Sequence, residues 1–137
     1  MGTTRARDPL TAAAVAFMAA NILHTLDHIR QGTGRLTTEV LAGGSLLTVL
    51  AAVVLVVVLR GNPRAPAFAA LVGMSGAIGI AASHLAPHWS ALSDPYPDLS
   101  VDALSWAVML LEIAAAAVLA IVAALELRRP AARPLNA

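Results

Sequence analysis

The histidines of this chain fall into two pairs with the same spacing. His24 and His28 lie in "HTLDH", and His84 and His88 lie in "HLAPH", so each of the four histidines belongs to a His-x-x-x-His pair. On a helix, residues four apart share a face, and imidazole nitrogens are ligands for zinc, copper and iron. The four residues are therefore candidate metal ligands, provided that the fold brings the two pairs together.

Two carboxylates are candidates to complete such a site. Asp27 lies on the flank of the helical stripe formed by Asn21, His24 and His28, and it is expected to be a further metal ligand or a general base. Glu112 lies within an apolar stretch, where an ionisable residue is costly and usually faces the interior of a bundle. It is the second candidate for the base. Three protein ligands and one water make an ordinary catalytic zinc, and the metal lowers the pKa of that water to about 7.

The rest of the chain indicates a membrane protein. Hydrophobic residues make up 58% of its 137 residues and charged residues only 12%, which is too little polar surface for a soluble domain of this size. The apolar residues fall into four blocks, and each can cross a hydrocarbon core, which needs about 20 residues. Lipid cannot satisfy open backbone groups, so helices are expected. The sequence predicts an all-α, integral membrane four-helix bundle with up-down-up-down topology.

The predicted organisation is a single transmembrane domain covering residues 1–137. The "RRPAARPLNA" tail, residues 128–137, is expected to be disordered. Small residues let helices approach closely in lipid, and the third span carries Gly73, Gly76 and Gly79 as a predicted packing face. The four spans are expected at about 9–29, 39–60, 65–88 and 101–127.

Arginine supplies all the positive charge, and its distribution predicts the orientation. The positive-inside rule assigns the arginine-rich side of a membrane protein to the cytoplasm. Both termini are therefore expected in the cytoplasm of a multi-pass cell-membrane protein, with the histidine pairs near the outer leaflet. Seven arginines fall on the cytoplasmic side and two on the other: Arg5, Arg7, Arg60, Arg64, Arg128, Arg129 and Arg133 against Arg30 and Arg35.

The segment between the third and fourth spans is expected outside the membrane. Trp89, Tyr96 and Trp106 flank it, as in the aromatic belt of a membrane interface. Pro87 lacks a helical donor and clashes with the preceding turn. His88 is therefore expected at the exit from the helix, aimed differently from a regular partner four residues after His84.

Zinc is the metal that this ligand set favours, with copper, iron and b-type haem as alternatives. The chain has no cysteine, which excludes thiolate ligands and c-type haem attachment. A metal-bound water near the outer leaflet predicts hydrolysis of a lipid or another lipophilic small molecule. The net charge of +1 gives no indication of nucleic-acid binding. The sequence is compatible with a homo-oligomer.

Three other functions fit the same residues. Histidines on facing helices are the usual axial ligands of b-type haem, which would make the protein an electron carrier. A metal-free, proton-linked carrier would use Glu112 as its coupling carboxylate and the histidines as a pH-sensitive gate. An accessory subunit of a membrane complex would use its polar residues for assembly. In the blandest interpretation the histidines only form hydrogen bonds across helices or at the interface.

Overall fold

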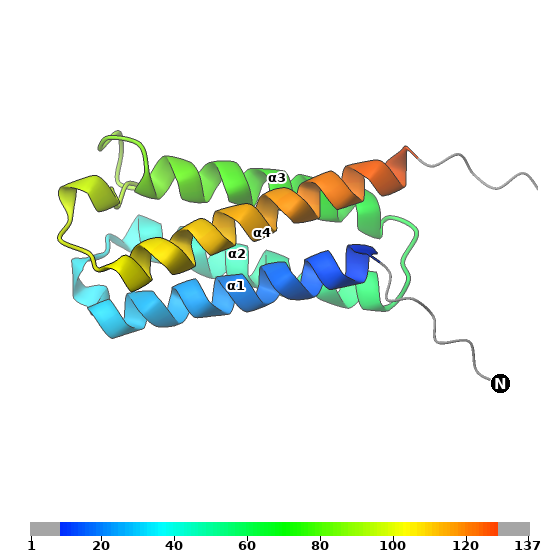
Figure 1. Cartoon of the computed structure of the whole chain (residues 1–137), viewed down its shortest axis with the longest axis horizontal. Helices are drawn as coiled ribbons and strands as arrows, with labels where there is room; N and C mark the ends of the chain where they lie inside the picture. The colour runs from blue at the N-terminus through cyan, green and yellow to red at the C-terminus, as the bar shows by residue number, and fades with distance from the viewer. Residues whose placement is uncertain (1–8, 129–137) are drawn as a thin grey trace, which may run out of the picture.

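The structure, a computed structural model, describes residues 9–128, and within that range the chain contains helices and turns but no strand. Figure 1 shows the helices packed side by side along one long axis. Short 3₁₀ turns cover Thr33–Arg35 and Tyr96–Asp98. The long helices are α1 (Pro9–Gln31), α2 (Thr38–Leu59), α3 (Ala65–His84) and α4 (Ala103–Leu127).

Each of these four helices is long and apolar enough to cross a membrane. The prediction of an all-α chain with four such helices is therefore confirmed. Three of the predicted spans agree with the helix bounds to within two residues at each end. The predicted disordered tail lies outside the described residues, except for Arg128.

Polar side chains mark where two of the helices begin. The Thr37 hydroxyl accepts a hydrogen bond from the Val40 backbone N–H at 3.1 Å, and the Asp102 carboxylate accepts one from the Ser105 N–H at 3.0 Å. Such N-caps satisfy backbone donors that have no partner within the helix. Thr37 and Asp102 therefore fix the residues at which α2 and α4 begin.

The third helix ends at His84, four residues before the predicted end of its span at 88. Pro87 explains the difference, because a proline cannot donate to the helix and clashes with the carbonyl four residues earlier. The carbonyl groups that have no helical partner where α3 ends accept hydrogen bonds from the following loop. Ser83 O accepts from the Asp94 N–H at 2.9 Å, and Ala82 O accepts from the Trp89 indole N–H at 2.9 Å.

The closest helix contact joins α3 to α4. A Cβ atom added at Gly73 would lie 2.7 Å from the Ala116 carbonyl oxygen and 2.8 Å from the Ala120 nitrogen. Gly73 and Gly76 are buried, but Gly79 is exposed and has open space around its Cα. The predicted packing face therefore holds for Gly73 and Gly76, and not for Gly79.

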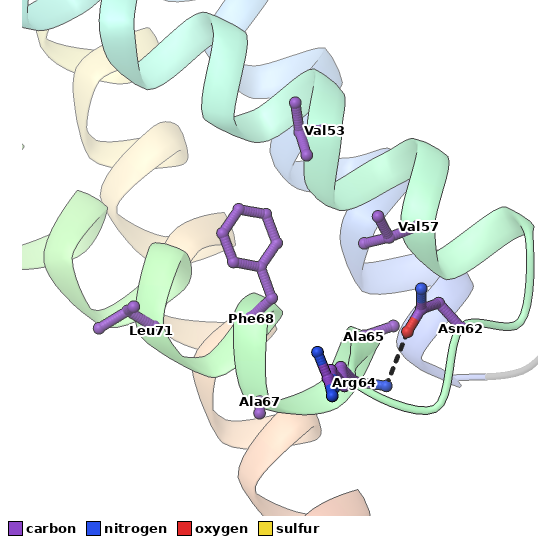
Figure 2. Close-up of a pocket in the computed structure, with 8 residues that line it drawn as sticks. All are labelled: Val53, Val57, Asn62, Arg64, Ala65, Ala67, Phe68 and Leu71. Atoms are coloured by element: carbon purple, nitrogen blue, oxygen red, sulfur yellow. Dashed lines mark hydrogen bonds between the residues drawn. The ribbon is translucent and has the colours of Figure 1, made fainter.

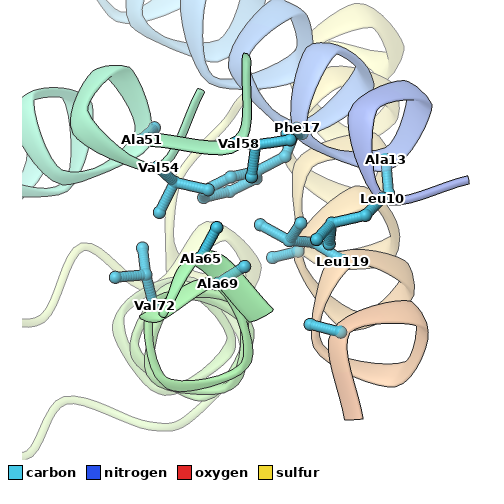
Figure 3. Close-up of a cluster of buried hydrophobic side chains, with 13 residues drawn as sticks. Leu10, Ala13, Phe17, Ala51, Val54, Val58, Ala65, Ala69, Val72 and Leu119 are labelled. Atoms are coloured by element: carbon cyan, nitrogen blue, oxygen red, sulfur yellow. The ribbon is translucent and has the colours of Figure 1, made fainter. Parts of the chain in front are cut away.

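An apolar core fills the half of the bundle away from the histidines. Figure 3 shows side chains from all four helices meeting there, with Phe17, Val54 and Leu119 fully buried at its centre. The outward faces are also apolar, and Leu71 and Ile78 are 66% and 64% exposed. An apolar surface of this extent is expected where helices face lipid.

Helices α1 and α4 run antiparallel. His24 contacts Glu112, whereas Arg30, further along α1, contacts Asp102 at the start of α4. This arrangement brings polar residues of the two helices together over several turns.

Candidate metal centre

Three of the four histidines meet at one end of the bundle. His24 and His28 lie one turn apart on α1, and His84 is the last residue of α3. One ring nitrogen from each lies within 4.8 Å of the others. The ring centroids are separated by 4.6 Å for His24 and His28, 5.0 Å for His24 and His84, and 5.4 Å for His28 and His84. His24 and His84 are buried, and His28 is partly exposed.

The orientation of His24 is set by two residues deep in the bundle. Its Nδ1 atom forms a hydrogen bond with the Glu112 carboxylate, and the other oxygen of that carboxylate accepts from Asn21 Nδ2 at 2.7 Å. Where the Glu112 carboxylate accepts from Nδ1, Nε2 of His24 has the lone pair, and that nitrogen faces the Tyr96 hydroxyl 3.3 Å away.

His84 is held in the same way by the loop that follows α3. Its Nδ1 atom lies 3.0 Å from the Asp94 backbone carbonyl, which accepts only, so this nitrogen donates and Nε2 keeps its lone pair. Metal-binding histidines usually donate their second ring nitrogen to a carboxylate or a carbonyl. His24 and His84 both have such a partner.

Asp94 lies beneath this loop rather than in solvent. It is 8% exposed, and burial raises the pKa of its carboxyl group above the ordinary value. One carboxylate oxygen, Oδ2, lies 3.6 Å from His84 Nδ1 and has no hydrogen-bond partner among residues 9–128. No motif or spacing in the sequence singles out Asp94.

Tyr96 also differs from its expected place. An aromatic belt predicts an interfacial side chain, but Tyr96 is 1% exposed and packs beneath the loop. Its ring centroid is 4.7 Å from that of His84, and its hydroxyl lies 3.3 Å from His24 Nε2. Burial raises the pKa of Tyr96 to about 12, so the hydroxyl is protonated at neutral pH. Trp89, which is 53% exposed, is compatible with the predicted belt.

Asp27, a predicted ligand and base, is occupied by other partners. Its Oδ1 atom accepts from Arg30 Nε at 2.8 Å, and its Oδ2 atom accepts from Gln31 Nε2 at 2.6 Å. Arg30 also reaches across to the Asp102 carboxylate at 2.9 Å. Asp27 therefore belongs to a network that joins α1 to the start of α4, and it is not part of the histidine group.

His88 lies outside the group as well. It follows Pro87 in the loop after α3, and its side chain is exposed. The structure thus brings together three of the five predicted ligands, His24, His28 and His84, and adds Glu112 and Tyr96 as their immediate neighbours.

Comparisons with known proteins identify no relative: no family model matches the chain, and neither the curated proteins nor the solved structures gave a match.

Proposed function

We propose that this membrane protein binds one divalent transition-metal ion through His24, His28 and His84. The observation that carries the proposal is the convergence of three ring nitrogens within 4.8 Å of one another. Two of the rings also have an acceptor on Nδ1, the arrangement usual for metal-binding histidines. The Tyr96 hydroxyl that contacts His24 Nε2 would have to give way to the metal.

Zinc suits the three histidines best. Zinc–nitrogen bonds are about 2.0–2.1 Å long, so tetrahedral ligand nitrogens lie about 3.3 Å apart. The three nitrogens lie within 4.8 Å of one another, so metal binding would bring them closer together. Three imidazoles with one open position are a known catalytic zinc set. Copper and iron also accept nitrogen ligands and are the alternatives.

Hydrolysis is the reaction that an open zinc position supports. A zinc ion held by His24, His28 and His84 would lower the pKa of water to near neutral and would so supply a nucleophile without a separate carboxylate base. This removes the need for Asp27 or Glu112 as the base, since both carboxylates already accept hydrogen bonds from neighbouring side chains. The Tyr96 hydroxyl, 3.3 Å from His24 Nε2, would be a hydrogen-bond donor beside the metal ligands.

The substrate class follows from the position of the centre along the helices. The histidines lie near the ends of two apolar helices, and the arginine distribution puts these ends near the outer leaflet. Partly exposed His28 marks the accessible side. A lipid or another membrane-soluble molecule with a hydrolysable bond is therefore the proposed substrate.

Haem fits this arrangement less well than a bare metal ion. A porphyrin held by two histidines lies between their rings. The centroid of the His28 ring lies 4.6 Å from that of His24 and 5.4 Å from that of His84. His28 would therefore have to move away before a porphyrin could lie between the other two rings.

A proton-linked carrier is the second candidate, because Asn21, Glu112 and His24 form a buried hydrogen-bonded chain.

Metal content tests the proposal, with His88 as a matched control. The protein would be purified without chelator and without nickel affinity resin, and its metals measured by elemental analysis. We expect about one zinc per chain in the wild type, a large loss in His28→Ala, and unchanged content in His88→Ala. A metal-free wild type overturns the proposal, as does an equal loss in both variants.

The hydrolytic step has its own test. Metal-loaded protein would be assayed in bilayers against phospholipid esters and hydrophobic nitrophenyl esters. Activity that is lost on stripping zinc and restored on refilling supports hydrolysis. Full metal binding without any zinc-dependent activity on these substrates would contradict the hydrolase while leaving the metal site in place.

A further inference from the structure

An apolar groove lies between α2 and α3 at the end of the bundle opposite the histidines. It has a volume of about 540 Å³, and Figure 2 shows it bounded by the end of α2, the connecting loop and the start of α3. Its apolar wall is formed by Val53 and Val57 of α2 with Phe68 and Leu71 of α3. Val53 is 42% exposed and Leu71 66%, so the groove is open to the surroundings of the bundle.

Polar groups are confined to one end of this groove. Arg64 and Asn62 lie in the loop before α3 and line the groove there. The side-chain oxygen Oδ1 of Asn62 accepts from the Arg64 backbone N–H at 2.9 Å, which leaves the side-chain NH2 group of Asn62 as a donor. Both side chains are exposed, and the Arg64 guanidinium has no acidic partner within residues 9–128.

The charge at this end is positive. The loop "RGNPRAP" carries Arg60 and Arg64 and contains no acidic residue. The N-terminus of α3, at Ala65, adds the partial positive charge of a helix start. A guanidinium group matches the planar oxygens of a phosphate and binds them in bidentate fashion.

We propose that this groove binds an anionic phospholipid, with one acyl chain along the apolar wall and the phosphate at Arg64 and Asn62. The groove has an apolar wall that fits a hydrocarbon chain, and hydrogen-bond donors and positive charge lie at one end of it. A phospholipid in one leaflet has the same arrangement of an apolar chain and a charged headgroup. The positive-inside rule puts this end at the cytoplasmic leaflet, where anionic lipids attract basic residues.

The bound lipid would stabilise α2. Only 11% of the most apolar window of α2 is buried within the protein, compared with 33–39% for the other three helices. A lipid chain packed against both Val57 and Phe68 would add contacts between α2 and α3. This role is independent of the metal centre, because the groove shares no residue with it.

The test compares lipids and matched variants of the full chain. Native mass spectrometry would count lipid bound to the protein released from nanodiscs of phosphatidylglycerol or phosphatidylcholine. We expect the wild type to retain phosphatidylglycerol over phosphatidylcholine by roughly tenfold, the effect of one charge-assisted pair. Arg64→Gln should remove this preference, and Arg60→Gln, which removes one charge from the same loop but no group that lines the groove, should reduce it much less.

A second pair of variants tests the apolar part. Val53→Trp would fill the groove, whereas Val56→Trp, at a residue that is also 42% exposed, would not. Loss of retained lipid only in Val53→Trp supports the proposal. Equal retention of both lipids indicates annular contact only and overturns it, as does an equal loss in Arg60→Gln and Arg64→Gln. A wild-type dimer that Val53→Trp dissociates would mean that a second copy covers the groove, which also overturns it.

Discussion

The Nδ1 atom of His24 forms a hydrogen bond with the carboxylate of Glu112 at the buried interface of α1 and α4. The two residues lie 88 positions apart in the chain. Their hydrogen bond determines which ring nitrogen of His24 would bind a metal. The partner of a ligand is therefore as important to this centre as the ligand itself.

Substitution of Glu112 by glutamine should weaken metal binding. The amide keeps one acceptor oxygen, which Asn21 Nδ2 needs, and would then present its NH2 group to Nδ1 and favour the other tautomer of His24. Loss of such a partner reduces metal affinity by about 10–100-fold. Competition with a chromophoric chelator would measure the change. Glu39→Gln, which alters an exposed carboxylate at the start of α2, is the control and should leave the affinity unchanged.

The proton-linked carrier makes the opposite prediction for Glu112→Gln. Transport would stop while zinc affinity remained at the wild-type value. An unchanged affinity would therefore remove the role assigned here to Glu112 and favour the second candidate function.

Gly73→Ala should destabilise the bundle, whereas Gly79→Ala should not. A methyl group at residue 73 would lie 2.7 Å from a backbone oxygen of α4, and overpacking of this kind typically costs about 1–3 kcal/mol. Nothing lies within 4 Å of the corresponding position at Gly79, where alanine is the better helix former. Thermal unfolding in detergent would measure both free-energy changes. Equal changes would contradict the close contact of α3 with α4.

Asp102 should make the stability of α4 depend on pH in the acid range. The hydrogen bond from the Ser105 backbone, followed by the one from Arg30, lowers the pKa of Asp102 from 3.8 to about 2. The folded state binds the proton of Asp102 less tightly than the unfolded state does. The contribution of Asp102 to the free energy of unfolding is therefore complete above the pKa of the unfolded state, and it is lost as the pH falls through the pKa of the folded state. Asp102→Ala should therefore lower the Tm at pH 7, and the difference from wild type should shrink between about pH 4 and pH 2.

Circular dichroism at a series of pH values would measure that Tm difference. Asp98→Ala, at an exposed acid of the same loop, serves as the control for the loss of one carboxylate. A constant difference for Asp102→Ala across the acid range would contradict the hydrogen bonds that Asp102 accepts from Ser105 and Arg30.

The sequence was sufficient to predict the elements and most of the histidine group. Long uncharged blocks imply helices in lipid, and four-residue spacing places His24 and His28 on one face. The effect of Pro87 on helix geometry was also predictable, and it left His88 outside the group. These inferences depend on local spacing, which a single sequence displays directly.

The neighbours of the histidines were not predictable from spacing. Asp94 and Tyr96 reach the site because the loop turns back and bonds to the end of α3, and this contact joins residues with no periodic relation. Glu112 was predicted only to face the interior of the bundle, and no partner followed from its position in the sequence. His24 lies one turn deeper than His28, and that turn brings it to Glu112.

The most direct test of the metal centre is X-ray absorption spectroscopy of the protein loaded with one equivalent of zinc. Three histidine ligands predict three imidazole shells at about 2.0–2.1 Å plus one lighter ligand, a pattern unchanged in His88→Ala and reduced by one imidazole in His28→Ala. A spectrum dominated by oxygen ligands, or one that is the same in wild type and His28→Ala, would contradict a centre built from His24, His28 and His84.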